Sequence, residues 1–184
     1  AFFSDEYHPT NYGHDIMSDC IMQMVRVLDT AEADELKPLA EKAIKGRNFV
    51  GTKMIDSATE GIAIEAGAFT KVDSEIQRFS PKMLPSFPNN WMHDGEAGND
   101  SFKMTLNCKN LLMNYKTGSG AFGTAEVYVD GALVKSLNGA GGWNNSNVVL
   151  LIDEKGAAEH IVEIRMAEGQ EDKAFTIYAF GYTE

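Results

Sequence analysis

The spacing of the hydrophobic residues changes along the chain. Between residues 13 and 29, apolar side chains recur every three or four positions with polar residues between them, which predicts an amphipathic α-helix. A second helix is predicted over residues 37–45, because Pro38 is tolerated in a first helical turn and Gly46 is a natural helix end. From residue 47 onward the pattern becomes that of β-strands.

This second part of the chain contains short strand-like runs separated by turn residues. Residues 80–101, rich in proline, asparagine and glycine, predict a long irregular loop, and Asp130-Gly131 is typical of a two-residue hairpin turn. The expected strands cover residues 48–55, 61–67, 68–72, 101–108, 111–117, 125–129, 132–137, 148–152, 161–167 and 174–182. The predicted fold class is therefore mainly β: an antiparallel β-sandwich or jelly roll preceded by one or two α-helices.

Composition narrows the classes of function. The chain has 184 residues, 43% of them hydrophobic, and a net charge of −11, which argues against binding to nucleic acid or to an anionic membrane. No apolar run is long enough to span a bilayer. Cys20 falls on the apolar side of the first predicted helix and Cys108 in a predicted strand, so both are expected to be reduced thiols in the core.

The residues before the first helix carry the chemistry of a general base. Asp5 precedes His8 by three positions, so its carboxylate can accept a hydrogen bond from one imidazole nitrogen. The other nitrogen is then free to take a proton from a nucleophile. Pro9 biases His8 toward an extended conformation, and Gly13 permits a close approach into the helix. The alternative is that Asp5 and His8 are ordinary loop residues.

This pattern, Asp-x-x-His-Pro-x-x-x-Gly-His over residues 5–14, resembles the last conserved block of the SGNH (GDSL-like) esterase and acylhydrolase family. The match covers roughly residues 2–29. The resemblance implies that His8 is the general base of a catalytic triad, that Asp5 orients it, and that His14 is structural. The family's serine lies in a Gly-Asp-Ser turn, which this chain lacks. The chain alone is therefore expected to be inactive, because a base without a nucleophile has nothing to activate.

The predicted helix over residues 13–29 needs a packing partner for its apolar side. In the family this helix would pack on a parallel sheet that belongs to the remainder of the hydrolase domain. The stripe is therefore expected to be exposed here, or covered by another chain through self-association. Without the family resemblance, the same stripe predicts an ordinary core helix.

The predicted sandwich has a resemblance of its own, to the β-sandwich appended to many SGNH carbohydrate esterases, a module similar to carbohydrate-binding jelly rolls. The runs that carry it are Val127-Tyr128-Val129-Asp130-Gly131, Gly142-Trp143-Asn144-Asn145 and Glu159-His160-Ile161-Val162-Glu163-Ile164. In the acetyl-xylan esterase relatives a comparable sandwich precedes the hydrolase domain, whereas here it would follow. The resemblances imply an SGNH hydrolase end over residues 1–30, a helical connector over 31–46 and the sandwich over 47–184.

Two loops could hold sugar. A sugar ring needs an aromatic face for its C–H surface and amides for its hydroxyl groups. Trp143 offers the first beside Asn144 and Asn145, and Trp91 offers the same beside a pair of asparagines. The alternative is that both tryptophans fill the ends of the core and that the asparagines form turns.

Metal, phosphate and cofactor sites are not predicted. The acidic loop over residues 93–100 does not fit the calcium-loop spacing, and the glycine-rich run 118–123 lacks the Lys-Ser/Thr of a phosphate cradle. His160 is expected to be structural. The two resemblances together imply the C-terminal part of a serine esterase acting on acylated, specifically acetylated, carbohydrate or another small ester. Two alternatives stay open: a non-catalytic carbohydrate-binding module, and a structural accessory domain.

Overall fold

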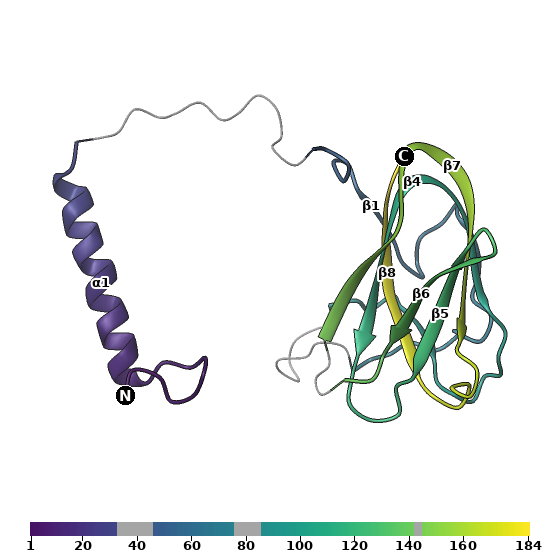
Figure 1. Cartoon of the computed structure of the whole chain (residues 1–184), viewed down its shortest axis with the longest axis horizontal. Helices are drawn as coiled ribbons and strands as arrows, with labels where there is room; N and C mark the ends of the chain where they lie inside the picture. The colour runs from purple at the N-terminus through teal and green to yellow at the C-terminus, as the bar shows by residue number, and fades with distance from the viewer. Residues whose placement is uncertain (33–45, 76–85, 142–144) are drawn as a thin grey trace. The chain divides into compact units, whose positions relative to one another are not determined.

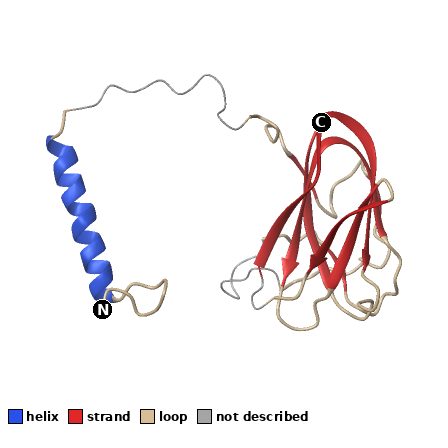
Figure 2. Ribbon diagram, viewed as in Figure 1, coloured by secondary structure: helices blue, strands red, loops and turns tan. Residues whose placement is uncertain are grey.

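The computed structural model describes residues 1–32, 46–75, 86–141 and 145–184 (Figure 1). The chain divides into two compact units, Ala1–Ile44 and Lys45–Glu184. The first unit is helical and the second is built of strands (Figure 2). The mainly β class with a preceding helix is therefore confirmed.

The first unit contains one described helix, α1, over Asn11–Thr30, which confirms the helix predicted from residues 13–29. Thr10 caps its beginning, because its side-chain oxygen accepts a hydrogen bond from the Gly13 N–H at 3.1 Å. The second predicted helix, over residues 37–45, lies outside the described residues. Across the described ranges, no helix combines the length and apolar character that crossing a membrane requires.

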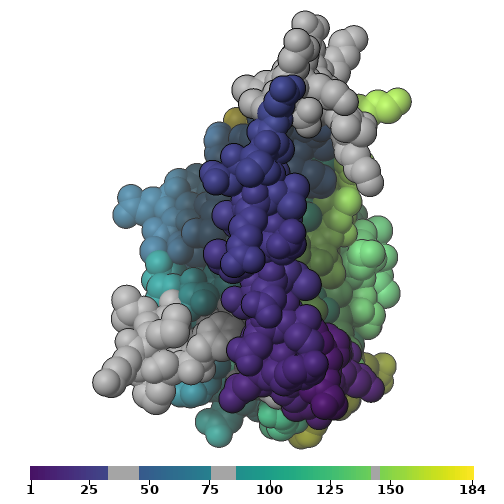
Figure 3. Space-filling model, turned by 90° about the vertical axis from the view of Figure 1, so that its left-hand side faces the viewer, coloured from purple at the N-terminus to yellow at the C-terminus, as the bar shows by residue number. Residues whose placement is uncertain are grey.

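Helix α1 is drawn in purple to blue in Figure 3. The side chains of its apolar stripe are exposed. Ile21, Met24 and Leu28 have 54%, 56% and 62% of their surface exposed. Cys20 is exposed as well, so the prediction of a core thiol at this position is wrong. The physical reason is that residues 1–32 contain no second element that packs against this side of the helix.

The second unit is an antiparallel β-sandwich. Its strands are β1 (Lys53–Ile55), β2 (Ala63–Glu65), β3 (Trp91–His93), β4 (Phe102–Thr117), β5 (Thr124–Val129), β6 (Ala132–Asn138), β7 (Asn145–Met166) and β8 (Phe175–Thr183). They form one sheet in the order β1-β8-β4-β7-β5-β6, while β2 pairs with β4 and β3 with β8. Every pair of named strands is antiparallel.

Two long strands carry this sheet through both layers of the sandwich. β4 and β7 pair from Phe102↔Ile164 to Thr117↔Asn145, with a shift of register after Cys108. Before the shift the other side of β4 is occupied by β2, and after it by β8. The sheet folds over at this point, where β4 and β7 arch across the upper end of the sandwich in Figure 1.

The long strands differ from the sequence prediction. The runs expected as separate strands over 101–108 and 111–117 are one strand, β4, and those over 148–152 and 161–167 belong to β7. The run over 68–72 is not a strand, apart from one bridge between Lys71 and Met92. The loop expected over 80–101 contains β3. The hairpin turn at Asp130-Gly131 is confirmed, because both residues have a positive φ, 51° and 80°.

Aromatic rings fill the space between the layers. Phe102, fully buried, lies 5.3 Å from the ring centre of Trp91 and 5.7 Å from that of Phe180. Cys108 is buried in the same core, as expected. Burial raises the pKa of its thiol to about 11, so the group stays protonated and unreactive at neutral pH.

His160 lies at the corner of the sandwich and is 5% exposed. Its Nδ1 is 2.8 Å from Oδ2 of Asp130, in the hairpin turn between β5 and β6, and Asp130 Oδ1 accepts from the Ile161 N–H at 2.9 Å. The side chain thus ties the turn to β7, which fits the structural role expected from the sequence.

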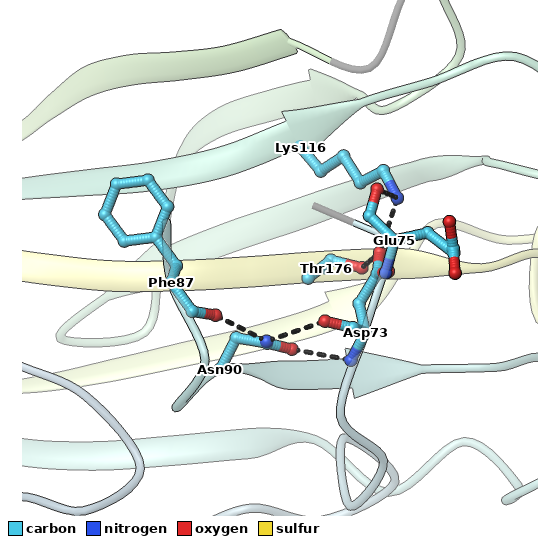
Figure 4. A network of polar contacts seen from close by, with 6 residues as sticks. All are labelled: Asp73, Glu75, Phe87, Asn90, Lys116 and Thr176. Carbon is cyan, nitrogen blue, oxygen red and sulfur yellow. Dashed lines mark hydrogen bonds and ion pairs between the residues drawn. The ribbon is translucent and has the colours of Figure 1, made fainter. Parts of the chain in front are cut away.

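A buried ion pair joins the segment before β3 to the main sheet. Lys116 Nζ lies 2.7 Å from Asp73 Oδ2, with 3% and 5% of the two side chains exposed (Figure 4). Thr176 of β8 donates to the same oxygen at 3.0 Å. The amide of Asn90 accepts from the Asp73 N–H and donates to the Asp73 carbonyl, at 2.8 and 3.1 Å. The segment is therefore held through both its side chain and its backbone.

Removing one member of this pair should leave an uncompensated buried charge. We expect Lys116→Met to lower the free energy of unfolding by about 3 kcal/mol, because the Asp73 carboxylate stays buried without its cation. Urea unfolding measures the change. The matched control is Lys103→Met, at an exposed position of β4, which should change stability little. Asp73→Asn added to Lys116→Met should recover part of the loss, and equal losses in the single and double variants would contradict the assignment.

Candidate functional site

The candidate site begins with a closed loop before α1. The Thr10 N–H donates to the Phe2 carbonyl at 2.9 Å, and the Ser4 N–H donates to the His8 carbonyl at 2.8 Å. Phe3 and Pro9 form a bridge between these two bonds. The two ends of the segment are therefore clamped together, and Asp5 and His8 lie at the closed tip.

The structure brings the predicted pair together. His8 Nδ1 lies 2.7 Å from Asp5 Oδ2. The other carboxylate oxygen, Oδ1, accepts from the backbone N–H groups of Tyr7 and His8, each at 2.8 Å. Because an ionised carboxylate only accepts hydrogen bonds, Nδ1 of His8 carries the proton in this arrangement.

The same contacts keep Asp5 ionised. The Tyr7 N–H, then the His8 ring, then the His8 N–H hold the pKa of the Asp5 carboxyl below its usual value. Each of these donors stabilises the negative charge, which disappears when the carboxyl takes up a proton. Asp5 is therefore ready to stabilise a positive charge on the imidazole.

The second imidazole nitrogen is available for proton transfer. The His8 side chain is 76% exposed and the Asp5 side chain 54%. With Nδ1 bound to Asp5, Nε2 is the nitrogen that can accept a proton from a hydroxyl group. In the described part of the chain no hydroxyl bonds to it, and the nearby Ser4 hydroxyl donates to the His8 carbonyl at 2.9 Å.

Three residues hold this arrangement against the helix. Gly13 is buried, and a Cβ there would lie 2.2 Å from the Phe2 carbonyl oxygen, so only glycine fits. This close approach was predicted from the sequence. The roles of Ser4 and Thr10, which grip the His8 and Phe2 carbonyls, were not predicted. Their signal in the sequence was weak, since serine and threonine make such local bonds in many turns.

The residues predicted to hold sugar do not lie together on an open surface of the described structure. Trp143 and Asn144 lie outside the described residues, and Asn145 begins β7 opposite Thr117. Trp91 is 6% exposed and belongs to the core, so its ring offers no open face to a sugar. This burial favours the alternative given above, in which Trp91 fills the core. Pairing of β3 with β8, which sets Trp91 opposite Ile177, carries the ring inward.

In the acidic loop after β3, polar side chains bond to the backbone of the loop itself. His93 is buried, with Nε2 2.9 Å from the Gly98 carbonyl oxygen, and the Asp94 carboxylate accepts from the Glu96 N–H at 3.0 Å. Among the residues that the structure describes, no three His, Cys, Asp or Glu side chains are grouped so that they could hold a metal ion.

Comparison with known proteins identifies the fold. No protein-family model and no curated protein matches the sequence. A two-domain esterase active on acetylated mannans, crystallised with mannopentaose, is similar in structure with a TM-score of 0.64 and 18% identity, over 100% of this chain and 49% of that one. A second structure of such an esterase gives a TM-score of 0.69 and 16% identity, over 100% and 50%. This chain thus spans about half the length of these structures.

A carbohydrate-binding module is also similar to this chain in structure. A family 35 carbohydrate-binding module from an environmental isolate has a TM-score of 0.50 and 12% identity, over 72% of this chain and 93% of the module. The second unit has a carbohydrate-esterase-type β-sandwich fold. At these identities the similarity concerns the fold.

The hydrogen bonds to Asp5 predict its titration. We expect ¹³C NMR to give a pKa for the Asp5 carboxyl below its ordinary 3.8. Because the pKa is lowered in the folded state, the stabilisation is complete above the unfolded value and is lost as pH falls through the folded one. His8→Ala should raise the pKa of Asp5 but leave it below 3.8, since the Tyr7 N–H remains. A carboxyl that titrates at or above 3.8 in the unchanged chain would contradict this geometry.

Proposed function

We propose that this chain is the C-terminal part of a serine ester hydrolase that removes acetyl groups from carbohydrate. The observation that carries the proposal is the Asp5–His8 contact of 2.7 Å, which leaves Nε2 of an exposed imidazole free. This is the arrangement that a general base and its orienting carboxylate need. The serine belongs to the remainder of the hydrolase domain.

The proposed reaction uses His8 twice. Nε2 takes the proton of the serine hydroxyl as that oxygen attacks the acetyl carbonyl, and then delivers the proton to the departing sugar oxygen. In the second step, His8 takes a proton from water as the water oxygen attacks the acetyl-serine ester, and acetate leaves as the proton passes to the serine oxygen. Asp5, ionised and held by two backbone N–H groups, stabilises the imidazolium in both steps.

The fold similarity supports the choice of substrate. An esterase active on acetylated mannans shares its fold with this chain over the chain's whole length. In the proposed arrangement, residues 1–30 complete the hydrolase domain, residues 31–46 connect the units and residues 47–184 form the sandwich. The exposed apolar side of α1 is then covered by the rest of that domain, as hydrophobic surface of this extent normally is.

Substitution of His8 tests the assignment directly. In the protein that carries residues 1–184 together with the serine-bearing portion, His8→Ala should lower kcat for acetyl release about 10²- to 10⁴-fold. The matched control is His14→Ala, a second exposed imidazole on the same segment, which should keep the activity. Acetate release from an acetylated mannan measures both variants. Activity that survives His8→Ala would remove His8 from the mechanism.

A second function, binding of carbohydrate by the sandwich, is favoured by one specific observation. The structural match to this chain covers 93% of a family 35 carbohydrate-binding module. Trp143, with Asn144 and Asn145, supplies the residue types that such binding uses.

Tryptophan fluorescence tests this second function. With Trp91 buried and Trp143 the only other tryptophan, a glycan that stacks on Trp143 should shift the emission of the intact chain. Trp143→Ala should abolish the shift, while Trp91 remains as an internal reference. An emission that no neutral or acidic oligosaccharide changes would argue against sugar binding at this tryptophan.

A further inference from the structure

The sandwich carries a hollow that the proposed esterase mechanism does not use. Its volume is about 370 Å³, within the range of small-molecule sites. It is centred on the outward side chains of β5 and the end of β7. The residues that line it are Asn99, Glu126, Tyr128, Arg165, Met166, Glu168 and Glu171.

A fixed stack of two planar groups forms part of this hollow. The Arg165 guanidinium carbon lies 4.4 Å from the ring centre of Tyr128. The Tyr128 hydroxyl donates to Glu126 at 2.6 Å and accepts from Arg165. Glu126 and Arg165 also face each other in the β5–β7 register. The side chains are therefore held in place before any ligand arrives, which lowers the entropy cost of binding.

The charges around the stack favour a neutral ligand. The lining has three carboxylates, from Glu126, Glu168 and Glu171, and a single cation, Arg165. That cation is already engaged with Tyr128 and lies 3.5 Å from a Glu126 oxygen. An anionic ligand would meet net negative charge, whereas hydroxyl groups would find carboxylate and amide acceptors in excess.

We propose that this hollow is a subsite for an uncharged sugar unit of the carbohydrate. Glu168, Glu171 and the Asn99 amide accept hydrogen bonds from its hydroxyl groups, and the Arg165–Tyr128 stack supports the ring. This inference rests on the proposed carbohydrate-directed function. It adds where on the sandwich the sugar binds and that the site prefers an uncharged sugar.

Calorimetric titration of the intact chain tests the subsite. Mannopentaose, a neutral oligosaccharide, should bind, and an oligogalacturonate of the same length should not. Glu171→Gln and Asn99→Ala should each weaken mannopentaose binding about tenfold, the usual cost of losing a hydrogen bond to a charged or amide partner in a binding site. Both residues are on the surface, and thermal unfolding of each variant verifies that the fold persists.

The controls separate this subsite from the wider proposal. Asn107→Ala, at an exposed position of β4 outside the hollow, should leave mannopentaose affinity unchanged. Loss of binding on Trp143→Ala, with the Glu171 and Asn99 variants unaffected, would overturn the subsite but leave sugar binding by the sandwich intact. Tighter binding of the oligogalacturonate, or no binding of mannopentaose, would also overturn it, while the esterase proposal stands or falls separately on His8→Ala.

Discussion

The pairing of β4 with β7 is the constraint on which the sandwich depends. These strands run side by side through both layers, so their register decides which side chains face inward throughout the unit. It places Phe102 in one half of the core and Leu111 in the other, both fully buried. The other strands extend the sheet on both sides of this pair. The buried Asp73–Lys116 contact attaches the segment before β3 to the end of β4.

In the first unit, by contrast, the contacts of the Asp5–His8 pair join residues that are close together in the sequence. Every hydrogen bond to the Asp5 carboxylate comes from Tyr7 or His8, and the loop is closed by Thr10 onto Phe2. The geometry of the pair therefore does not depend on how the strands fold. Local turns are therefore enough to bring a carboxylate and an imidazole into contact.

Sequence patterns were informative where the interactions are local and failed where they are distant. The helix over 13–29, the Asp130-Gly131 turn and the Asp5–His8 contact all rest on neighbouring residues, and each was predicted. The union of two expected strands into β4 was not, because Lys109-Asn110 resembles a loop and becomes strand only through pairing. The role of Trp91 was left open between a sugar platform and a core residue, because its inward direction is set by β8, more than 80 residues later.

The bend of β7 opposite Lys109 can accept additional residues. Cys108 pairs with Ala158 and Asn110 with Asp153, so four residues of β7, 154–157, lie opposite Lys109 alone. A Cβ on Gly156 would meet no atom within 4 Å. We therefore expect that residues added at Gly156 leave the register on either side unchanged. The bend is a natural insertion point, where a tag or an additional loop can be grafted while both layers keep their alignment.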